Sequence, residues 1–102
     1  DYDVLVYVAN WPAARSYAWR QLRIARAIEN QAFVVGVNRV GVDGHGVEHT
    51  GHGGVHDFLG APLLEQAEEA RIDTVTLHRE PLQRFREKFP AQLDADRFTI
   101  HP

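Results

Sequence analysis

The feature that most constrains this chain is a pair of apolar runs separated by a helical pattern. Residues 4–9 (VLVYVA) form a nearly continuous run of β-type residues, which is typical of a strand buried on both faces. Pro12 suits the first turn of a helix, and residues 13–31 repeat apolar side chains at three- and four-residue spacing. A second apolar run follows at 33–37. Two such strands joined by a helix predict a crossover unit with parallel strands, and therefore an α/β fold.

The helix and the rest of the chain can be predicted from the same patterns. The apolar stripe of the helix is expected at Ala14, Ala18, Leu22, Ala25 and Ile28. Residues 41–60 are rich in Gly, His and Asp, and they predict loops and a hairpin, with a short strand at 55–59 and its partner from Leu63 onward. Residues 72–77 alternate apolar and polar, which predicts a half-exposed strand, and residues 79–88 predict a final helix.

The composition is that of an ordinary globular domain. Its 102 residues, 44% of them hydrophobic and 25% charged, provide one modest core, so residues 1–102 are expected to belong to a single domain. A net charge of -3 gives no electrostatic footprint for nucleic acid. No apolar run approaches the roughly 20 residues that cross a bilayer, and the acidic start is unlike a signal peptide, so we expect no membrane association and a cytoplasmic location.

Two further features concern what this chain can do by itself. It contains no cysteine, which excludes a disulfide framework and a thiol nucleophile within these residues. It also opens directly on a strand of buried type, without a preceding arm. Such a start is expected for a part of a longer domain, produced by truncation, processing or excision.

A group of histidines is the densest collection of reactive side chains. It consists of His45, His49, His52 and His56, with Asp43, Glu48 and Asp57 beside them. Histidines at i and i+4 share a face only on a helix, which the surrounding glycines disfavour, and on a strand they lie too far apart to chelate one ion. Exposed loop histidines are therefore the favoured interpretation, and a metal site is the alternative.

Three stretches resemble a known family. They are residues 7–12 (YVANWP), residues 19–31 with ARAIENQ at their end, and residues 35–41 (VGVNRVG). In this order and spacing they resemble the nitrilase superfamily of carbon–nitrogen hydrolases, and residues 86–96 resemble its omega-amidase-like branch. The resemblance covers nearly the whole chain.

The resemblance implies a four-layer α-β-β-α sandwich of which residues 1–102 form the C-terminal portion. It implies an amidase that uses a Glu, a Lys and a Cys, without a cofactor, to hydrolyse a small omega-amide of a dicarboxylic acid to the acid and ammonia. By the family's layout all three catalytic residues lie upstream, so none is assigned here. The implied partners are the amide, the missing N-terminal half and, in a homodimer, a second copy.

The resemblance assigns possible roles to five residues. Asn10 and Trp11 match a loop beside the substrate pocket, where they would orient a substrate carboxylate or wall the cleft. A helix cap and a packed indole are equally open interpretations of these two residues. Asn38 matches a position at the pocket rim. Arg26 and Glu29 match the helix motif, where a structural ion pair or a hydrogen bond to the backbone is expected.

The sequence departs from the family's pattern in two loops. It has Gly51-His52-Gly53 where Gly-Asp-Ser is common, and Asp43-Gly44-His45-Gly46 where Asp-Gly-Asn-Gly is common. These departures bear on the substrate preference and leave the architecture intact. The alternative to an amidase is a non-catalytic module of a degenerate relative, with metal binding through the four histidines.

Overall fold

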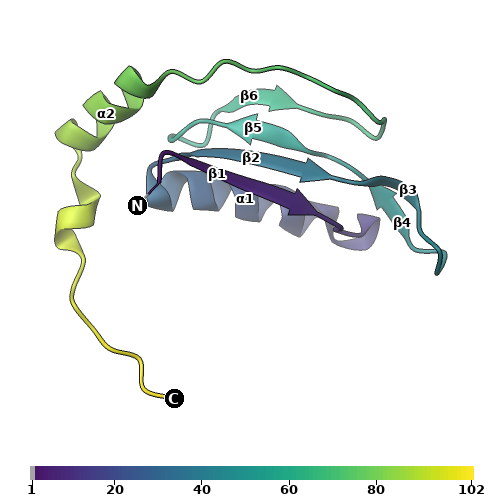
Figure 1. The fold of residues 1–102 in the computed structure, drawn as a ribbon, viewed down its shortest axis with the longest axis horizontal. Coiled ribbons are helices and arrows are strands. Elements are labelled where there is room, and N and C mark those ends of the chain that lie inside the picture. The colour runs from purple at the N-terminus through teal and green to yellow at the C-terminus, as the bar shows by residue number, and fades with distance from the viewer. Residues whose placement is uncertain (1) are drawn as a thin grey trace.

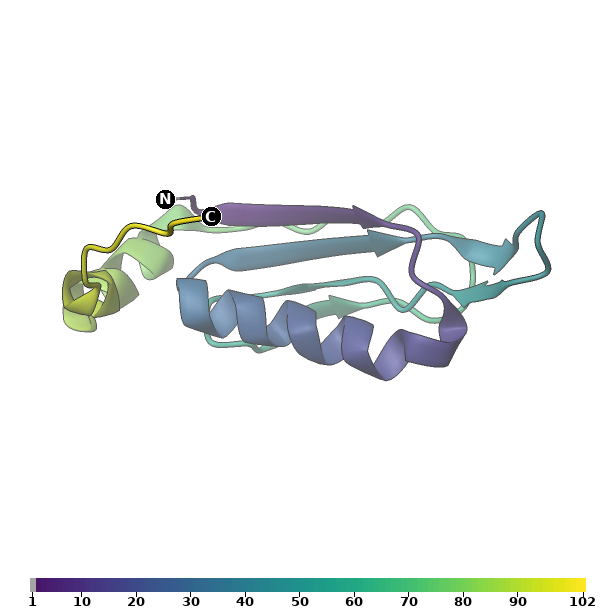
Figure 2. The same ribbon diagram turned by 90° about the horizontal axis from the view of Figure 1, so that it is seen from below.

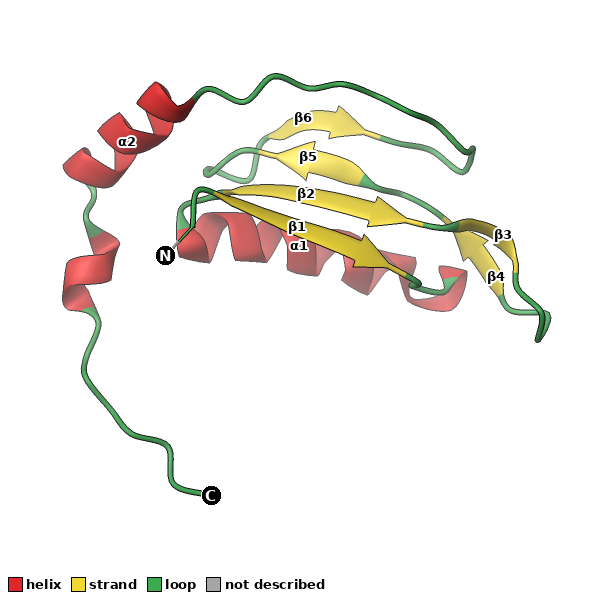
Figure 3. Cartoon of the chain, viewed as in Figure 1, coloured by secondary structure: helices red, strands yellow, loops and turns green. Residues whose placement is uncertain are grey.

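The computed structural model describes residues 2–102, which form a curved sheet with a long helix along one face (Figures 1 and 3). In chain order the elements are β1 (Val4–Ala9), η1 (Ala13–Arg15), α1 (Ser16–Asn30), β2 (Phe33–Asn38), β3 (Val40–Val42), β4 (Glu48–Thr50), β5 (Gly54–His56), β6 (Pro62–Glu65), α2 (Arg79–Lys88) and η2 (Ala91–Asp94). None of the helices among these residues is long and apolar enough to cross a membrane.

The main sheet has the strand order β1-β2-β5-β6, and its topology confirms the predicted crossover. β1 and β2 are parallel, with Val4 opposite Phe33 at one end and Ala9 opposite Asn38 at the other, and α1 connects them. β5 is antiparallel to both β2 and β6, so the predicted hairpin is also confirmed. Its first strand ends at His56, earlier than expected, because Asp57 turns the chain by accepting hydrogen bonds from the N–H groups of Leu59 and Ala61. β3 and β4 form a separate two-stranded sheet.

The face of α1 that packs on the sheet is not the predicted one. Its buried residues are Trp19, Arg23 and Ala27, which follow one another at four-residue spacing. The predicted stripe was wrong, since Ala14, Leu22, Ala25 and Ile28 are exposed and Ala18 is half-buried. The physical reason is that Arg23 fits against strands that present glycine at this level, which a hydrophobic periodicity cannot reveal.

β1 was expected to be buried on both faces, and in the described chain it is not. It lies at the edge of the sheet, with Leu5 and Tyr7 half-buried on the side of α1. The alternate residues Val4, Val6 and Val8 are 39%, 57% and 85% exposed. Figure 2 shows α1 along one face of the sheet, while no helix of residues 2–102 covers the other face of β1. The hydrophobic run therefore predicted the strand correctly and its surroundings incorrectly.

Residues 72–77 were predicted to form a strand, and this was wrong. The segment is extended and its burial alternates, with Asp73, Val75 and Leu77 half-buried, but it pairs with no strand among residues 2–102. Its side chains instead line a hollow of about 330 Å³ together with Val35 and Val55 of the sheet. Here the alternation of apolar and polar residues therefore indicates a segment that lies against a sheet face, and not a strand that pairs within the sheet.

The predicted helix at 79–88 is confirmed as α2, which is held at the other end of the sheet from the β3–β4 hairpin (Figure 1). Leu82 is fully buried. Arg86 donates hydrogen bonds to the Asp3 carboxylate at 2.7 Å, the Tyr2 carbonyl at 2.8 Å and the Gln31 carbonyl at 3.0 Å. One arginine therefore ties α2 to the start of β1 and to the end of α1.

Candidate functional site

The carboxyl ends of β1 and β2 bring the three predicted substrate-binding residues to one edge of the sheet. Asn10 and Trp11 follow β1, and Asn38 is the last residue of β2. Because these strands are parallel and in register, their carboxyl ends coincide. Ligands of α/β proteins bind preferentially at this kind of edge. We therefore take it as the candidate site.

Asn38 joins two loops at this edge through its side-chain amide. Its Oδ1 accepts a hydrogen bond from the Trp11 N–H at 2.8 Å, and its Nδ2 donates to the carbonyls of Trp11 at 2.9 Å and Gly51 at 3.0 Å. Both amide protons are engaged, so Asn38 serves here to place Trp11 and the segment at Gly51.

Trp11 is held firmly, whereas Asn10 is open to solvent. The Trp11 indole Nε1 donates to the Arg15 carbonyl at 2.6 Å, and its ring lies 5.8 Å from the Trp19 ring. The Arg15 guanidinium lies 5.4 Å from the centre of the Trp11 ring. Asn10 is exposed and does not cap a helix, because Pro12 is the N-cap of η1 and Arg15 that of α1.

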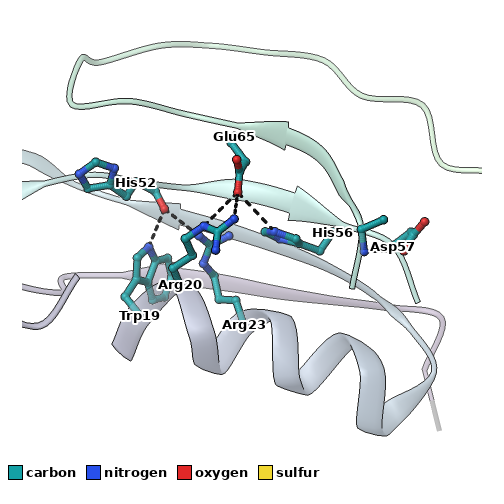
Figure 4. A network of polar contacts seen from close by, with 8 residues as sticks. Trp19, Arg20, Arg23, His52, His56, Asp57 and Glu65 are labelled. Carbon is teal, nitrogen blue, oxygen red and sulfur yellow. Dashed lines mark hydrogen bonds and ion pairs between the residues drawn. The ribbon is translucent and has the colours of Figure 1, made fainter. Parts of the chain in front are cut away.

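The loop of residues 51–53 lies beside Asn38 and is held from below by α1. The His52 carbonyl accepts hydrogen bonds from the Trp19 Nε1 at 2.9 Å and the Arg23 Nη2 at 2.7 Å, and Figure 4 shows both side chains reaching up to it. The sequence analysis missed Trp19 and Arg23 as site residues. The available signal was their four-residue spacing, which places an indole and a guanidinium on one helix face.

Arg23 is a buried cation. It is 3% exposed, its guanidinium carbon lies 4.8 Å from the centre of the Trp19 ring, and Nε and Nη1 have no hydrogen-bond partner within residues 2–102. The space it occupies exists because Gly36 has no side chain, since a Cβ there would lie 2.3 Å from the Arg23 Cδ. Burial lowers the pKa of Arg23 to about 10, so the side chain remains charged at neutral pH.

His56 and Glu65 extend this polar cluster between α1 and the sheet (Figure 4). His56 is fully buried, and neither ring nitrogen has a hydrogen-bond partner in the described part of the chain. Burial, reinforced by the nearby Arg23 charge, lowers the pKa of His56. Glu65 lies 3.8 Å from the His56 Nε2 and accepts hydrogen bonds from Arg20, which lower the pKa of Glu65. The imidazole is therefore neutral at pH 7.

The expectation that the four histidines are exposed in a loop was wrong for two of them, because His49 and His56 are buried. His45 is exposed at the β3–β4 turn, and His49 is buried with its Nδ1 3.0 Å from the Val47 carbonyl oxygen. His52 lies 3.7 Å from Glu68, while His56 is enclosed under the sheet. Across residues 2–102, no three His, Asp or Glu side chains come together in a way that could hold a metal ion.

Arg26 and Glu29 form an exposed ion pair one turn apart on α1. The backbone carbonyl of Arg26 accepts a hydrogen bond from Asn30. An exposed pair of this kind contributes about 0–1 kcal/mol to stability. Its contacts are those of a structural pair on the helix surface.

Comparisons with known proteins identify the family. The model of the carbon-nitrogen hydrolase family matches residues 1–87. The chain is 48% identical over 102 residues to omega-amidase YafV of Yersinia enterocolitica, covering 98% of this chain and 40% of that protein. It is 40% identical over 89 residues to the 2-oxoglutaramate amidase of Paenarthrobacter nicotinovorans, covering 87% of this chain and 30% of that protein.

A solved structure agrees with these relatives. The chain matches XC1258 from Xanthomonas campestris, a CN-hydrolase superfamily protein crystallised with an arsenic adduct in its active site, with a TM-score of 0.94 and 48% identity. The match covers 99% of this chain and 38% of that protein. The chain thus spans about 40% of the length of the omega-amidases that it matches. With a family match over most of its residues and this structural likeness, the chain belongs to the carbon–nitrogen hydrolase family and is similar to its omega-amidases.

Proposed function

We propose that this chain is the C-terminal portion of an amidase that cleaves a small omega-amide of a dicarboxylic acid to the acid and ammonia. The observation that carries the proposal is the 48% identity to an omega-amidase over 98% of the chain. The similarity to a 2-oxoglutaramate amidase supports a substrate that carries both an amide and a distal carboxylate. The proposed location is the cytoplasm.

The proposed chemistry needs a nucleophile that these residues do not contain, because the chain has no cysteine. We assign the Cys, Glu and Lys to the preceding part of the same domain. The Cys thiolate forms a bond to the amide carbon, the carbon–nitrogen bond breaks, and the nitrogen leaves as ammonia after taking up a proton. Water then attacks the thioester, releases the acid and restores the thiol.

The contribution of this chain is to bind and orient the substrate. Asn10 is exposed at the carboxyl end of β1, so its amide N–H is available to a substrate carboxylate. Trp11 would form a wall of the cleft, and its fixed indole supports that role. Asn38 acts through its hydrogen bonds to Trp11 and Gly51, which keep the wall in place.

The rest of the domain is proposed to complete a four-layer α-β-β-α sandwich. The exposed valines of β1, which lie on the face away from α1, fit a surface that a second sheet would cover, and they are Val4, Val6 and Val8. We further propose that the complete protein is a homodimer. Gel filtration with light scattering of the complete protein would test this last point.

The test of the function uses the complete protein that contains this chain. Ammonia release is measured with 2-oxoglutaramate and with an amide of equal length in which a methyl group replaces the distal carboxylate. We expect turnover of the first and a much lower kcat/KM for the second, because the site would lose a charged contact. The 102-residue chain alone should release no ammonia. Equal turnover of both amides, or turnover by the chain alone, would contradict the proposal.

A further inference from the structure

The loop of residues 51–53 has a backbone that needs support from its surroundings. Gly51 and His52 both have positive φ, at 72° and 54°. Glycine adopts this conformation freely, but for a histidine it is unfavourable and persists only where neighbouring groups hold it. The strain therefore raises the question of which groups hold His52.

Two side chains of α1 and one of β2 supply that support. The His52 carbonyl accepts hydrogen bonds from the indole of Trp19 and the guanidinium of Arg23, and the Gly51 carbonyl accepts one from Asn38. The loop also lies directly on β2, since a Cβ at Gly53 would be 2.6 Å from the Gly36 oxygen. The carbonyls of both positive-φ residues are thus fixed by side chains from outside the loop.

Arg23 is poorly explained by stability alone. It is buried to 3% exposure, and two of its three guanidinium nitrogens have no partner among residues 2–102. A buried charge with incomplete hydrogen bonding contributes little to folding, and an apolar side chain of similar volume is often as good. The hydrogen bond that Arg23 does make goes to the loop at 2.7 Å.

The loop of residues 51–53 connects Trp19 and Arg23 to the candidate site. From the His52 carbonyl the contacts pass along the backbone to Gly51, from Gly51 to the Asn38 amide, and from Asn38 to both main-chain polar groups of Trp11. A change in the loop's position would therefore reach the residue proposed to wall the cleft.

We infer that Trp19 and Arg23 are positioning residues for the amide site, which act by clamping the His52 carbonyl and so fixing the loop and Trp11. This inference rests on the proposed function, because it takes the carboxyl edge of β1 and β2 as the substrate site. Neither residue contacts the reacting atoms. Their effect is on substrate binding, through the shape of the cleft wall.

The test uses the complete protein with Arg23→Met and, separately, Trp19→Phe. Methionine keeps much of the buried volume, and phenylalanine keeps an aromatic ring while removing the indole N–H. The matched control is Arg84→Met, which removes an exposed arginine, paired with Glu80, from the surface of α2. The measurements are KM and kcat for 2-oxoglutaramate, and hydrogen–deuterium exchange of the peptide that contains residues 51–53.

We expect KM to rise about tenfold in each of the two variants while kcat stays within about twofold, because each variant loses one hydrogen bond to the His52 carbonyl and this loss weakens substrate binding. Exchange in the 51–53 peptide should accelerate by a similar factor, with α1 unchanged and the control like wild type. If Arg23→Met does not fold, Trp19→Phe decides by the same readouts. Unchanged exchange in the loop, or faster exchange with an unchanged KM, would overturn the inference. An inactive wild-type protein would instead refute the proposed function.

Discussion

The contact between Gly36 and Arg23 allows a prediction that can be worked out from distances. In Gly36→Ala the new methyl group would lie 2.3 Å from the Arg23 Cδ, 3.0 Å from its Nε and 3.1 Å from its Nη1. Carbon atoms in contact are normally separated by about 3.5–4.0 Å. The methyl group and the arginine therefore cannot both keep their positions.

The expected loss of stability has two parts. Adding a methyl group to a packed interior costs about 1–3 kcal/mol. Moving the guanidinium also breaks its hydrogen bond to the His52 carbonyl, which contributes about 1 kcal/mol. Together they predict that the free energy of unfolding falls by about 2–4 kcal/mol.

The assay is urea denaturation of the complete protein, followed by circular dichroism. Gly44→Ala is the matched control, because a Cβ at Gly44 meets nothing within 4 Å and its φ is not positive. The control should be neutral or slightly stabilising. Arg23→Ala combined with Gly36→Ala should recover part of the loss, since the clash is then removed. If Gly36→Ala is as stable as Gly44→Ala, the described packing of Arg23 on β2 is wrong.

Three further predictions concern other parts of the fold. Burial lowers the pKa of His56 from its ordinary value of 6.5, so the unfolded chain binds the proton more tightly and stability should fall as the pH drops below about 6.5. In urea denaturation, His56→Leu should flatten this pH dependence, and an unchanged slope would exclude His56 as its source. Arg86→Met removes the hydrogen bonds from α2 to Asp3 and Gln31, so limited proteolysis should cut the 66–78 segment faster. An unchanged cleavage rate would show that these hydrogen bonds do not hold α2 in place. Leu82→Ala should lower the free energy of unfolding by about 2–5 kcal/mol, because the side chain is fully buried, and a loss below about 1 kcal/mol would argue against that packing.

The elements that could be predicted from the sequence are those with strong local patterns. The run at 4–9, the helical repeat and the run at 33–37 predicted the parallel pair and its crossover, and the structure has them with nearly the same bounds. The surroundings of these elements were predicted incorrectly. The helix packs through Arg23 because the facing strand has Gly36, and this is a relation between residues of two different elements.

The candidate site, like the fold, could be predicted only in part. Asn10, Trp11 and Asn38 could be proposed because the resemblance to a family pointed to those positions, and the parallel pairing of β1 and β2 brings them to one edge. The clamp on the His52 carbonyl could not, because its acceptor is a main-chain group that residue type does not mark. Its donors also lie 33 and 29 residues away in the sequence. Contacts of this kind become visible only once the chain is folded.

The carboxyl edge of β1 and β2 is proposed to form one wall of an amide site whose nucleophile comes from outside these residues. The most direct measurement is a crystal structure of the complete protein with its nucleophilic cysteine replaced by alanine and 2-oxoglutaramate bound. We expect the ligand to lie within about 4 Å of the Trp11 ring or the Asn10 side chain. A ligand bound in full occupancy elsewhere, with this edge in contact only with solvent, would contradict it.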